Sequence, residues 1–400
     1  MLFGSSWYTK AFILTLTLFT IVLFFVADTL SISYHEAVIF YDTRNLLYFI
    51  THFFTDIFGH NNIALRAPSI LFYDLSVVLM YMLTKNYFKH ESDRFIAALI
   101  FMFLPGIIGA SLLVNNSIIV IFCTVLYLYY YKVYAKHNYY MLVIFLFIDN
   151  SFAILFLALF FYAFQNRENR LFIVSLILFG LSMYIYGFDT TGKPKSHILD
   201  MFAIYASIFS PLIFLYFFYA MYRIGIKGKR SIFWYICITA LIFSFLLSFR
   251  QKIYIEDFAP FVIITIPIMV KLYFHSLRVR LKRFRTKHYN IAYISFFILF
   301  LNVFVILFNK PLYLALNHPQ KHFVYNYHFA QEIATILKAN GINDVASNNK
   351  RLLKRLKFYG IRQGEYNFIS LNRLNIYDKK FQINYMNKNL LNVYYVDLKK

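Results

Sequence analysis

The segment ISYHEAVIFYDTRN, residues 32–45, gathers titratable side chains directly after a long apolar run. Glu36 follows Tyr34 and His35 and precedes apolar and aromatic residues, so we expect it on a partly buried interfacial helix. Burial of a carboxyl group raises its pKa towards the range that suits a general base. Glu36 is therefore our candidate for a catalytic carboxylate, with Asp42 as a supporting acid and His35 as a residue of the substrate cavity.

A second polar segment, FRQKIYIEDFAPF at residues 249–261, lies between two apolar runs. Arg250 and Lys252 are two residues apart, so in an extended chain their side chains point the same way and could together hold a phosphate group. Tyr254 is a third candidate contact for that phosphate, and Glu256 is a further cavity candidate. The alternative interpretation is that these basic residues lie at a helix end and reach for lipid headgroups.

The composition indicates the environment of both segments. Hydrophobic residues make up 60% of the 400-residue chain, aromatic residues 22% and charged residues only 14%. Soluble domains contain roughly 25% charged residues, so we interpret the chain as an integral membrane protein. Its net charge of +22 does not indicate a nucleic-acid partner, because Lys and Arg fall mostly in short clusters between apolar runs. Such clusters orient membrane proteins against anionic lipids.

Runs of about 20 apolar residues predict helices that cross the bilayer. One run, residues 139–164, is interrupted by the polar triplet 149–151. It is either one helix with a buried carboxylate or a hairpin of two short helices. Beside it we predict about nine full spans, at residues 11–28, 67–84, 95–114, 117–134, 171–187, 203–222, 232–249, 258–274 and 290–309.

The distribution of basic residues among the loops favours the hairpin. If residues 139–164 return to the side from which they start, eighteen Lys and Arg residues of the loops fall on one face and six on the other. A single crossing would exchange the faces of all later loops and remove this asymmetry. We therefore predict an all-α polytopic membrane bundle over residues 1–309, with the N-terminus in the cytoplasm and residues 29–66 as an outer loop.

Residues 310–400 differ in character from the bundle. They contain HFAQEIATILKANGINDVASNNKRLLKRLKFYGI, which is typical of an amphipathic helix, a turn at Gly341, a short strand and a second helix. We predict a small C-terminal α/β domain outside the cytoplasmic membrane, which in a bacterium is the periplasmic side of the inner membrane.

In the order of its motifs, the chain resembles the type C glycosyltransferases of the bacterial aminoarabinose transferase and protein mannosyltransferase-like family. The motifs are HEA, YDTRNLLYFI, IFGHNNIALRAPSILF and FLPGIIGASLLVNNSIIVIFCTVLYLY. In that family an acidic pair opens the first outer loop and a Leu-Arg-x-Pro-Ser turn follows, here at residues 65–69. The loop RQKIYIEDFAPF is similar to the family's basic-Tyr segment, and the tail with LKFYGI to its outer C-terminal domain.

The resemblance implies a donor sugar carried on polyprenyl phosphate and transferred outside the cytoplasmic membrane, near an acidic residue of the first loop. An outward-facing site has no pool of nucleotide sugars, which agrees with a donor that crosses the membrane on a lipid. The acceptor stays open among a lipid, a glycan and a protein. No cofactor is implied, and the histidines show no metal-ligand spacing. Whether a divalent cation assists the reaction is left open by the sequence.

Three positions depart from the family pattern. The acidic pair is His-Glu here, so its catalytic role falls to Glu36. The family's aspartate before the fourth span is matched by Asn116, which can hydrogen-bond a sugar but cannot act as a base. The family's Lys-Gly-Pro at the hairpin tip is matched by residues 149–151, which reverses the charge there. Asn116 and Asp149 are therefore cavity candidates, and we expect Arg66 to anchor the loop.

These patterns lead to two hypotheses of different classes. The first is an inverting membrane glycosyltransferase that moves a sugar from polyprenyl phosphate to an outward-facing acceptor. The second is a non-catalytic transporter or flippase-like protein that binds the same lipid. A transporter is expected to contain paired broken helices and charges along a path through the membrane, whereas this sequence gathers its charge at the outer mouth.

Overall fold

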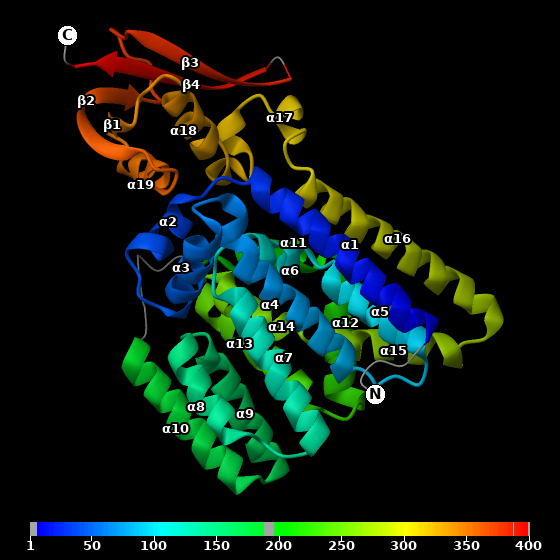
Figure 1. Cartoon of the computed structure of the whole chain (residues 1–400). Coiled ribbons are helices and arrows are strands. Elements are labelled where there is room, and N and C mark those ends of the chain that lie inside the picture. Colours follow the sequence, from blue (N-terminus) through cyan, green and yellow to red (C-terminus); the bar gives the residue numbers. More distant parts are fainter. Residues whose placement is uncertain (1–5, 188–195, 387, 399–400) are drawn as a thin grey trace. The chain divides into compact units, whose positions relative to one another are not determined.

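The computed structural model describes residues 6–187, 196–386 and 388–398. The chain divides into two compact units (Figure 1). The first unit contains the residues up to 20, residues 71–111 and residues 115–303, and the second contains 21–70, 112–114 and the residues from 304 onward. The helices that contribute residues to both units include α1 (Trp7–Thr29), α4 (Asn62–Leu83) and α16 (Lys282–Leu307).

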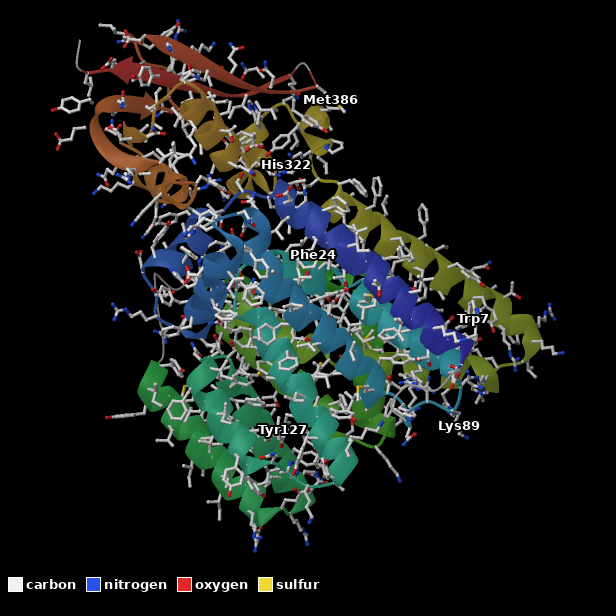
Figure 2. All side chains as sticks on the ribbon, viewed as in Figure 1. Trp7, Phe24, Lys89, Tyr127, His322 and Met386 are labelled. Carbon is white, nitrogen blue, oxygen red and sulfur yellow. The ribbon has the colours of Figure 1, made fainter. Side chains whose placement is uncertain are left out.

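The first unit is helical throughout its described elements. Apolar and aromatic side chains line these helices, as Figure 2 shows around Tyr127. Helices that are apolar on every side require an apolar surrounding. The elements not yet named are α5 (Glu91–Met102), α6 (Pro105–Leu112), α7 (Ser117–Tyr134), α8 (Tyr139–Ile148), α9 (Phe152–Asn166), α10 (Asn169–Tyr186), α11 (Ile198–Phe209), α12 (Pro211–Lys227), α13 (Ile232–Ser248), the 3₁₀ turn η1 (Ile255–Asp257), α14 (Ala259–Ile263) and α15 (Ile266–Val279).

The number of candidate membrane spans is smaller than expected. Within the described residues, six helical segments are long and apolar enough to cross a membrane, and the number rises to eight if each of two bent helix pairs counts as one span. The prediction of about nine full spans is therefore not confirmed. Helix α13, which coincides with the predicted span 232–249, has only 17 residues. Multiple apolar helices of this kind nevertheless indicate a multi-pass membrane protein.

Both bends lie at prolines within predicted spans. The predicted span 95–114 breaks before Pro105, where α5 and α6 meet at 52°, and the predicted span 203–222 breaks before Pro211, where α11 and α12 meet at 104°. A proline disfavours helical backbone in the residue before it. Ser210 accordingly has a φ of +73°, and its hydroxyl accepts a hydrogen bond of 3.0 Å from the side-chain amide of Asn302.

The segment with the polar triplet forms a hairpin, as expected. Helices α8 and α9 are separated by residues 149–151. His137 precedes α8 and Glu168 follows α9, and their Nε2 and Oε2 atoms are 3.0 Å apart. The two helices therefore run in opposite directions, with the triplet at the tip.

The second unit combines short helices with one sheet. Its helices are α2 (Tyr34–Tyr41), α3 (Leu46–Phe58), α17 (Leu312–Ala315), α18 (Ala330–Ala339) and α19 (Lys350–Phe358), with the 3₁₀ turns η2 (Pro319–Lys321) and η3 (Tyr325–Tyr327). Its strands are β1 (Asp344–Ala346), β2 (Arg362–Ser370), β3 (Lys379–Tyr385) and β4 (Lys388–Asp397). The sheet order is β1-β2-β4-β3, with β1 and β2 parallel and the other pairs antiparallel.

The small C-terminal sheet region confirms part of the fold prediction. The expected helix, turn, strand and helix are α18, Gly341 with a φ of +74°, β1 and α19. Leu337, Val345 and Leu356 pack in its hydrophobic core. Residues 29–66 belong to the same compact unit as the C-terminal region. The domain division at residue 309 stays a prediction. So does the location of the C-terminal domain outside the membrane.

Candidate functional site

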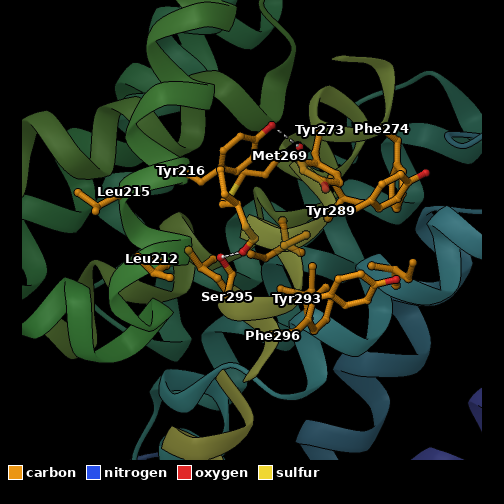
Figure 3. Close-up of a pocket in the computed structure, with 17 residues that line it drawn as sticks. Leu212, Leu215, Tyr216, Met269, Tyr273, Phe274, Tyr289, Tyr293, Ser295 and Phe296 are labelled. Atoms are coloured by element: carbon orange, nitrogen blue, oxygen red, sulfur yellow. Dashed lines mark hydrogen bonds between the residues drawn. The ribbon is translucent and has the colours of Figure 1, made fainter. Parts of the chain in front are cut away.

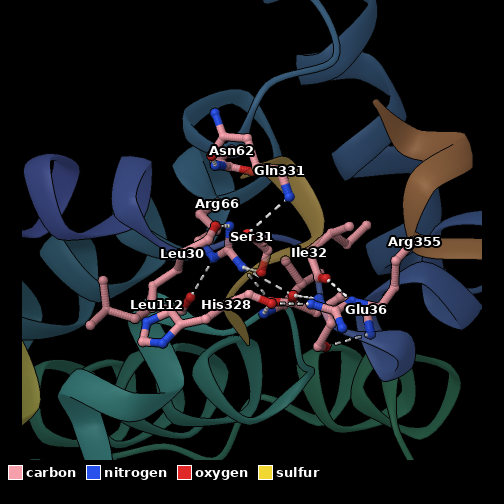
Figure 4. A network of polar contacts seen from close by, with 12 residues as sticks. Leu30, Ser31, Ile32, Glu36, Asn62, Arg66, Leu112, His328, Gln331 and Arg355 are labelled. Atoms are coloured by element: carbon pink, nitrogen blue, oxygen red, sulfur yellow. Dashed lines mark hydrogen bonds and ion pairs between the residues drawn. The ribbon is translucent and has the colours of Figure 1, made fainter. Parts of the chain in front are cut away.

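The start of α2 holds the first group of candidate residues, shown in Figure 4. Ser33 and Glu36 form a capping box: the Ser33 backbone N–H donates to Glu36 Oε2 (2.8 Å), and the Glu36 backbone N–H donates to Ser33 Oγ (3.2 Å). This reciprocal pair satisfies two backbone amides that a helix start would otherwise leave without partners. The Glu36 carboxylate is thus directed back onto its own helix end.

Arg66 of α4 forms an ion pair with Glu36. Its Nη2 atom lies 3.0 Å from Oε2 and 3.3 Å from Oε1, and the two side chains are only 0% and 2% exposed. The guanidinium also donates to the carbonyl oxygens of Leu30 (2.7 Å), Ser31 (3.1 Å) and Leu112 (2.8 Å). A buried ion pair needs such additional hydrogen bonds to offset the loss of hydration. These contacts are compatible with the loop-anchoring role expected of Arg66.

The Glu36 carboxylate has a further donor. The backbone N–H of Val114 donates to Oε1 over 3.1 Å, so both carboxylate oxygens accept hydrogen bonds within the protein. A carboxylate with these partners and 2% exposure holds neighbouring backbone in place. The structure thus gives Glu36 a structural role, and its catalytic role stays a prediction.

Residues of α19 extend this network. Arg355 donates from Nε to the carbonyl of Ile32 and from Nη2 to the carbonyl of His328, each over 2.7 Å. The Tyr359 hydroxyl accepts from the Ile32 backbone N–H (2.9 Å) and donates to Asn62 Oδ1 (2.6 Å). Burial and nearby cations lower the pKa of His328 to about 3, so this imidazole is neutral at physiological pH.

The other two candidates of the first segment are more exposed. His35 lies on the exposed side of α2. Asp42 follows α2, and its carboxylate, which is 50% exposed, pairs with Lys354 of α19. An exposed ion pair of this kind contributes little to stability.

A second group of candidate residues meets in the first unit, at the tip of the hairpin. Asn116, which precedes α7, donates from Nδ2 to Asp149 Oδ2 over 2.7 Å. The Ser151 backbone N–H donates to the other oxygen of Asp149 over 2.9 Å, and the Ser151 hydroxyl donates to it as well. The same hydroxyl lies 3.5 Å from Oδ1 of Asp257, at the end of η1. Two separate segments thus place two carboxylates around one serine, and a third supplies the Asn116 amide.

This arrangement changes the acidity of Asp257. Burial, followed by the nearby charges of Asp149 and Glu256, raises the pKa of Asp257 to about 7. Two carboxyl groups that share a site disfavour simultaneous ionisation. Asp257 can therefore take up and release a proton near neutral pH, which is the property required of a general acid or base.

The candidate phosphate contacts lie in the loop directly before this cluster. Arg250, Lys252 and Tyr254 are all exposed and precede Asp257 by three to seven residues. The Ser117 hydroxyl of α7 donates to the backbone carbonyl of Glu256 over 3.3 Å, which ties the end of this loop to the helix after Asn116. The loop that leads to Asp257 therefore carries two exposed cationic side chains and an exposed tyrosine.

The expected site residues thus fall into two groups. Asn116, Asp149 and Glu256 come together, whereas His35, Glu36, Asp42 and Arg66 belong to the other unit. Two participants, Ser151 and Asp257, were not among the predicted site residues. The sequence could have indicated both: Ser151 belongs to the same polar triplet as Asp149, and Asp257 directly follows Glu256. Apolar residues flank both polar stretches. Among the described residues, no group of three or more His, Cys, Asp or Glu side chains is arranged to hold a metal ion.

Comparison with known proteins adds one finding. A family model described as dolichyl-phosphate-mannose-protein mannosyltransferase matches residues 45–148, a range that runs from the start of α3 to the end of α8 and includes Arg66 and Asn116. No curated protein matches the chain. Over the matched range, the chain is similar to membrane glycosyltransferases of the polyprenyl-phosphate-sugar type.

Proposed function

We propose that this protein is an inverting membrane glycosyltransferase that moves a sugar from a polyprenyl-phosphate donor to an acceptor on the outer side of a bacterial inner membrane. The acceptor is a lipid, a glycan or a protein. The family match over residues 45–148 and the apolar helices support the general class. The observation that carries the proposal is the meeting of Asn116, Asp149, Ser151 and Asp257 beside a cationic loop.

In the proposed reaction, Asp257 accepts the proton of an acceptor hydroxyl as that oxygen bonds to the anomeric carbon of the sugar. The bond between the anomeric carbon and the phosphate oxygen breaks at the same time, and the electron pair leaves with polyprenyl phosphate. A base works best when its pKa lies near the working pH, which is the situation of Asp257. Asn116 and Asp149 would hydrogen-bond the sugar or the acceptor. Their own mutual hydrogen bond already holds these two side chains in place.

The departing phosphate requires positive charge. Arg250 and Lys252 would contact it electrostatically and Tyr254 would donate a hydrogen bond, since cationic groups placed where negative charge develops lower the barrier. All three side chains are exposed, which leaves them accessible to a headgroup at the membrane boundary.

Glu36 and Asp42 are the carboxylates expected for catalysis from the sequence. Glu36 accepts hydrogen bonds from Arg66, Ser33 and Val114, whereas among the described residues Asp257 accepts one side-chain hydrogen bond, of 3.5 Å from the Ser151 hydroxyl. We therefore propose Asp257 as the proton acceptor and Glu36, with Arg66, as the pair that positions the loop. Asp42 and His35 stay candidates for contacts with the acceptor.

The test combines gene deletion with complementation. Deletion is expected to remove or shorten a surface glycan or a glycolipid detected by mass spectrometry, and the full chain should restore it. Asp257→Asn should fail to restore it, because the amide cannot accept the proton. Asp56→Asn, which changes an exposed carboxylate of α3, is the matched control and should restore it fully. Restoration by Asp257→Asn would exclude Asp257 as the base.

A second function is favoured by one observation, the two bent helix pairs α5/α6 and α11/α12. Broken helices that expose backbone groups within the membrane are typical of transporter binding sites. A non-catalytic transporter or flippase-like protein would move the lipid-linked sugar without breaking a bond. In reconstituted vesicles it would carry a fluorescent polyprenyl-phosphate sugar across the bilayer, and Asp257→Asn would leave glycan transfer in cells unchanged.

A further inference from the structure

The first unit contains an apolar cavity of about 490 Å³ between α5, α12, α15 and α16 (Figure 3). Its walls are aliphatic and aromatic side chains, with Ser295 and the tyrosine hydroxyls as the polar exceptions. Cavities of roughly 300–1,000 Å³ are typical of small-molecule sites. The lining suits a hydrocarbon chain and offers little to a polar ligand.

One face of α16 leads from this cavity to positive charge. Tyr289, Tyr293 and Phe296 line the cavity with the spacing of a single helical face. Towards the helix start, the same face continues with Arg285 and Lys282, four and seven residues before Tyr289. One helical turn rises about 5.4 Å, so these two cations lie about one and two turns beyond the cavity lining.

Helix α15 shows the same progression in the opposite chain direction. Val270 and Phe274 line the cavity, and Arg278 follows four residues after Phe274. The Arg278 guanidinium lies 5.3 Å from the centre of the Phe274 ring and forms an ion pair of 2.6 Å with Asp93. Both cavity walls therefore end at guanidinium groups.

The turn between the two helices is strongly basic. Residues 271–287 contain seven Lys and Arg residues and no Asp or Glu. Asp93 neutralises one of these cations. Backbone contacts hold part of the turn, since Arg285 donates to the carbonyls of Arg280 (2.8 Å) and Arg278 (2.9 Å). The remaining charge is complementary to an anionic headgroup.

We propose that this cavity binds one acyl chain of an anionic membrane phospholipid, whose phosphate contacts the basic turn between α15 and α16. The apolar cavity supplies the site for the chain, and the cations one to two turns away supply the site for the headgroup. This site is separate from the residues assigned to sugar transfer, and the proposal does not depend on that function. A neutral phospholipid with the same chains would fill the cavity without the ionic contacts.

The headgroup part is tested with a matched pair of surface variants. Lys282 lies on the face that leads to the cavity, whereas Lys136 lies between α7 and α8, which do not line the cavity, and both lysines are exposed. The full chain is placed in nanodiscs of mixed phosphatidylglycerol and phosphatidylcholine with identical chains, and retained lipids are quantified by native mass spectrometry. Lys282→Gln should reduce the preference for phosphatidylglycerol about fivefold, which corresponds to about 1 kcal/mol per basic residue near anionic lipid. Lys136→Gln should leave it unchanged.

The chain part is tested by filling the cavity. Ala292 lines the cavity, and Ala292→Phe should displace the retained lipid. Ile294→Phe, on an exposed position of the same helix, is the control for added aromatic volume. Equal retention of both lipids by the unaltered protein, or equal effects of Lys282→Gln and Lys136→Gln, would overturn the proposal. Because the readout is lipid retention, a failure here is distinct from a failure of the glycosyltransferase assignment.

Discussion

Glu36 is a buried carboxylate and Asp257 a partly buried one, and the two differ most in their partners. Glu36 faces a guanidinium and two backbone amides. Asp257 faces a serine hydroxyl and two other acids. A carboxylate with matched donors is stable as an anion and holds structure, whereas an acid beside other acids retains its proton to higher pH. The number and charge of the groups around a carboxylate therefore distinguish one with a structural role from one that can transfer protons.

Arg66→Ala should have the largest effect on stability. It would leave Glu36 buried without its cation, and breaking a buried ion pair from one side costs about 3–5 kcal/mol. We expect a large fall in the midpoint of thermal unfolding, measured on detergent-solubilised protein. The double variant Arg66→Met with Glu36→Leu should recover part of the loss, because it removes both charges. An unchanged midpoint for Arg66→Ala would show that this pair does not hold the loop.

Acid should weaken the same unit through His328. Its folded pKa, about 3, is below the usual value of about 6.5, so its neutral form contributes stability above pH 6.5. That contribution is lost as the pH falls from 6.5 towards 3, by up to about 1.4 kcal/mol per pH unit. Unfolding midpoints measured across this range should fall less steeply for His328→Gln. Parallel curves would place the acid sensitivity elsewhere.

The Asp257 group should respond to pH in the direction set by its neighbours. Its raised pKa of about 7 means that the base form is lost below neutral pH, so sugar transfer should fall about tenfold per pH unit there. Asp149→Asn removes one charge that raises this pKa, so the falling limb should move to lower pH. Transfer by membranes with the natural donor lipid measures both profiles. A profile that Asp149→Asn does not move would contradict the coupling of the two acids.

Asp42→Asn should have the smallest effect. Its carboxylate is half exposed and pairs with Lys354, and exposed pairs contribute about 0–1 kcal/mol. The unfolding midpoint should therefore stay within about 1 kcal/mol of the unaltered protein, and the difference should shrink further in high salt. A loss as large as that of Arg66→Ala would mean that the pair is shielded from solvent.

Local patterns were sufficient for several elements. The Gly341 turn between an amphipathic helix and a short strand was visible in the sequence, and so was the hairpin around residues 149–151. The two helix bends were missed, because averaging hydropathy over 95–114 and 203–222 ignores the effect of Pro105 and Pro211 on the residue before each.

The two carboxylate groups required tertiary structure. Glu36 and Arg66 are 30 residues apart, and Ser151 and Asp257 are 106 residues apart. Nothing in the local sequence specifies which distant side chain completes either group. The sequence could therefore identify polar residues of interest, but it could not say which donor pairs with which acceptor. Those pairings are what distinguish the two groups.

The bend at Ser210 has a consequence for membrane sidedness. Helix α11 has 12 residues, which at 1.5 Å per residue is about 18 Å, well short of a hydrocarbon layer about 30 Å thick. Helix α12 has 17 residues and is about 26 Å long, and the two helices meet at 104°, so the pair forms either a broken span or a re-entrant loop. Every traversal exchanges inside and outside for the polypeptide that follows. Whether the chain crosses at this serine-proline corner or returns at it therefore contributes to deciding the compartment into which residues 249–257 emerge.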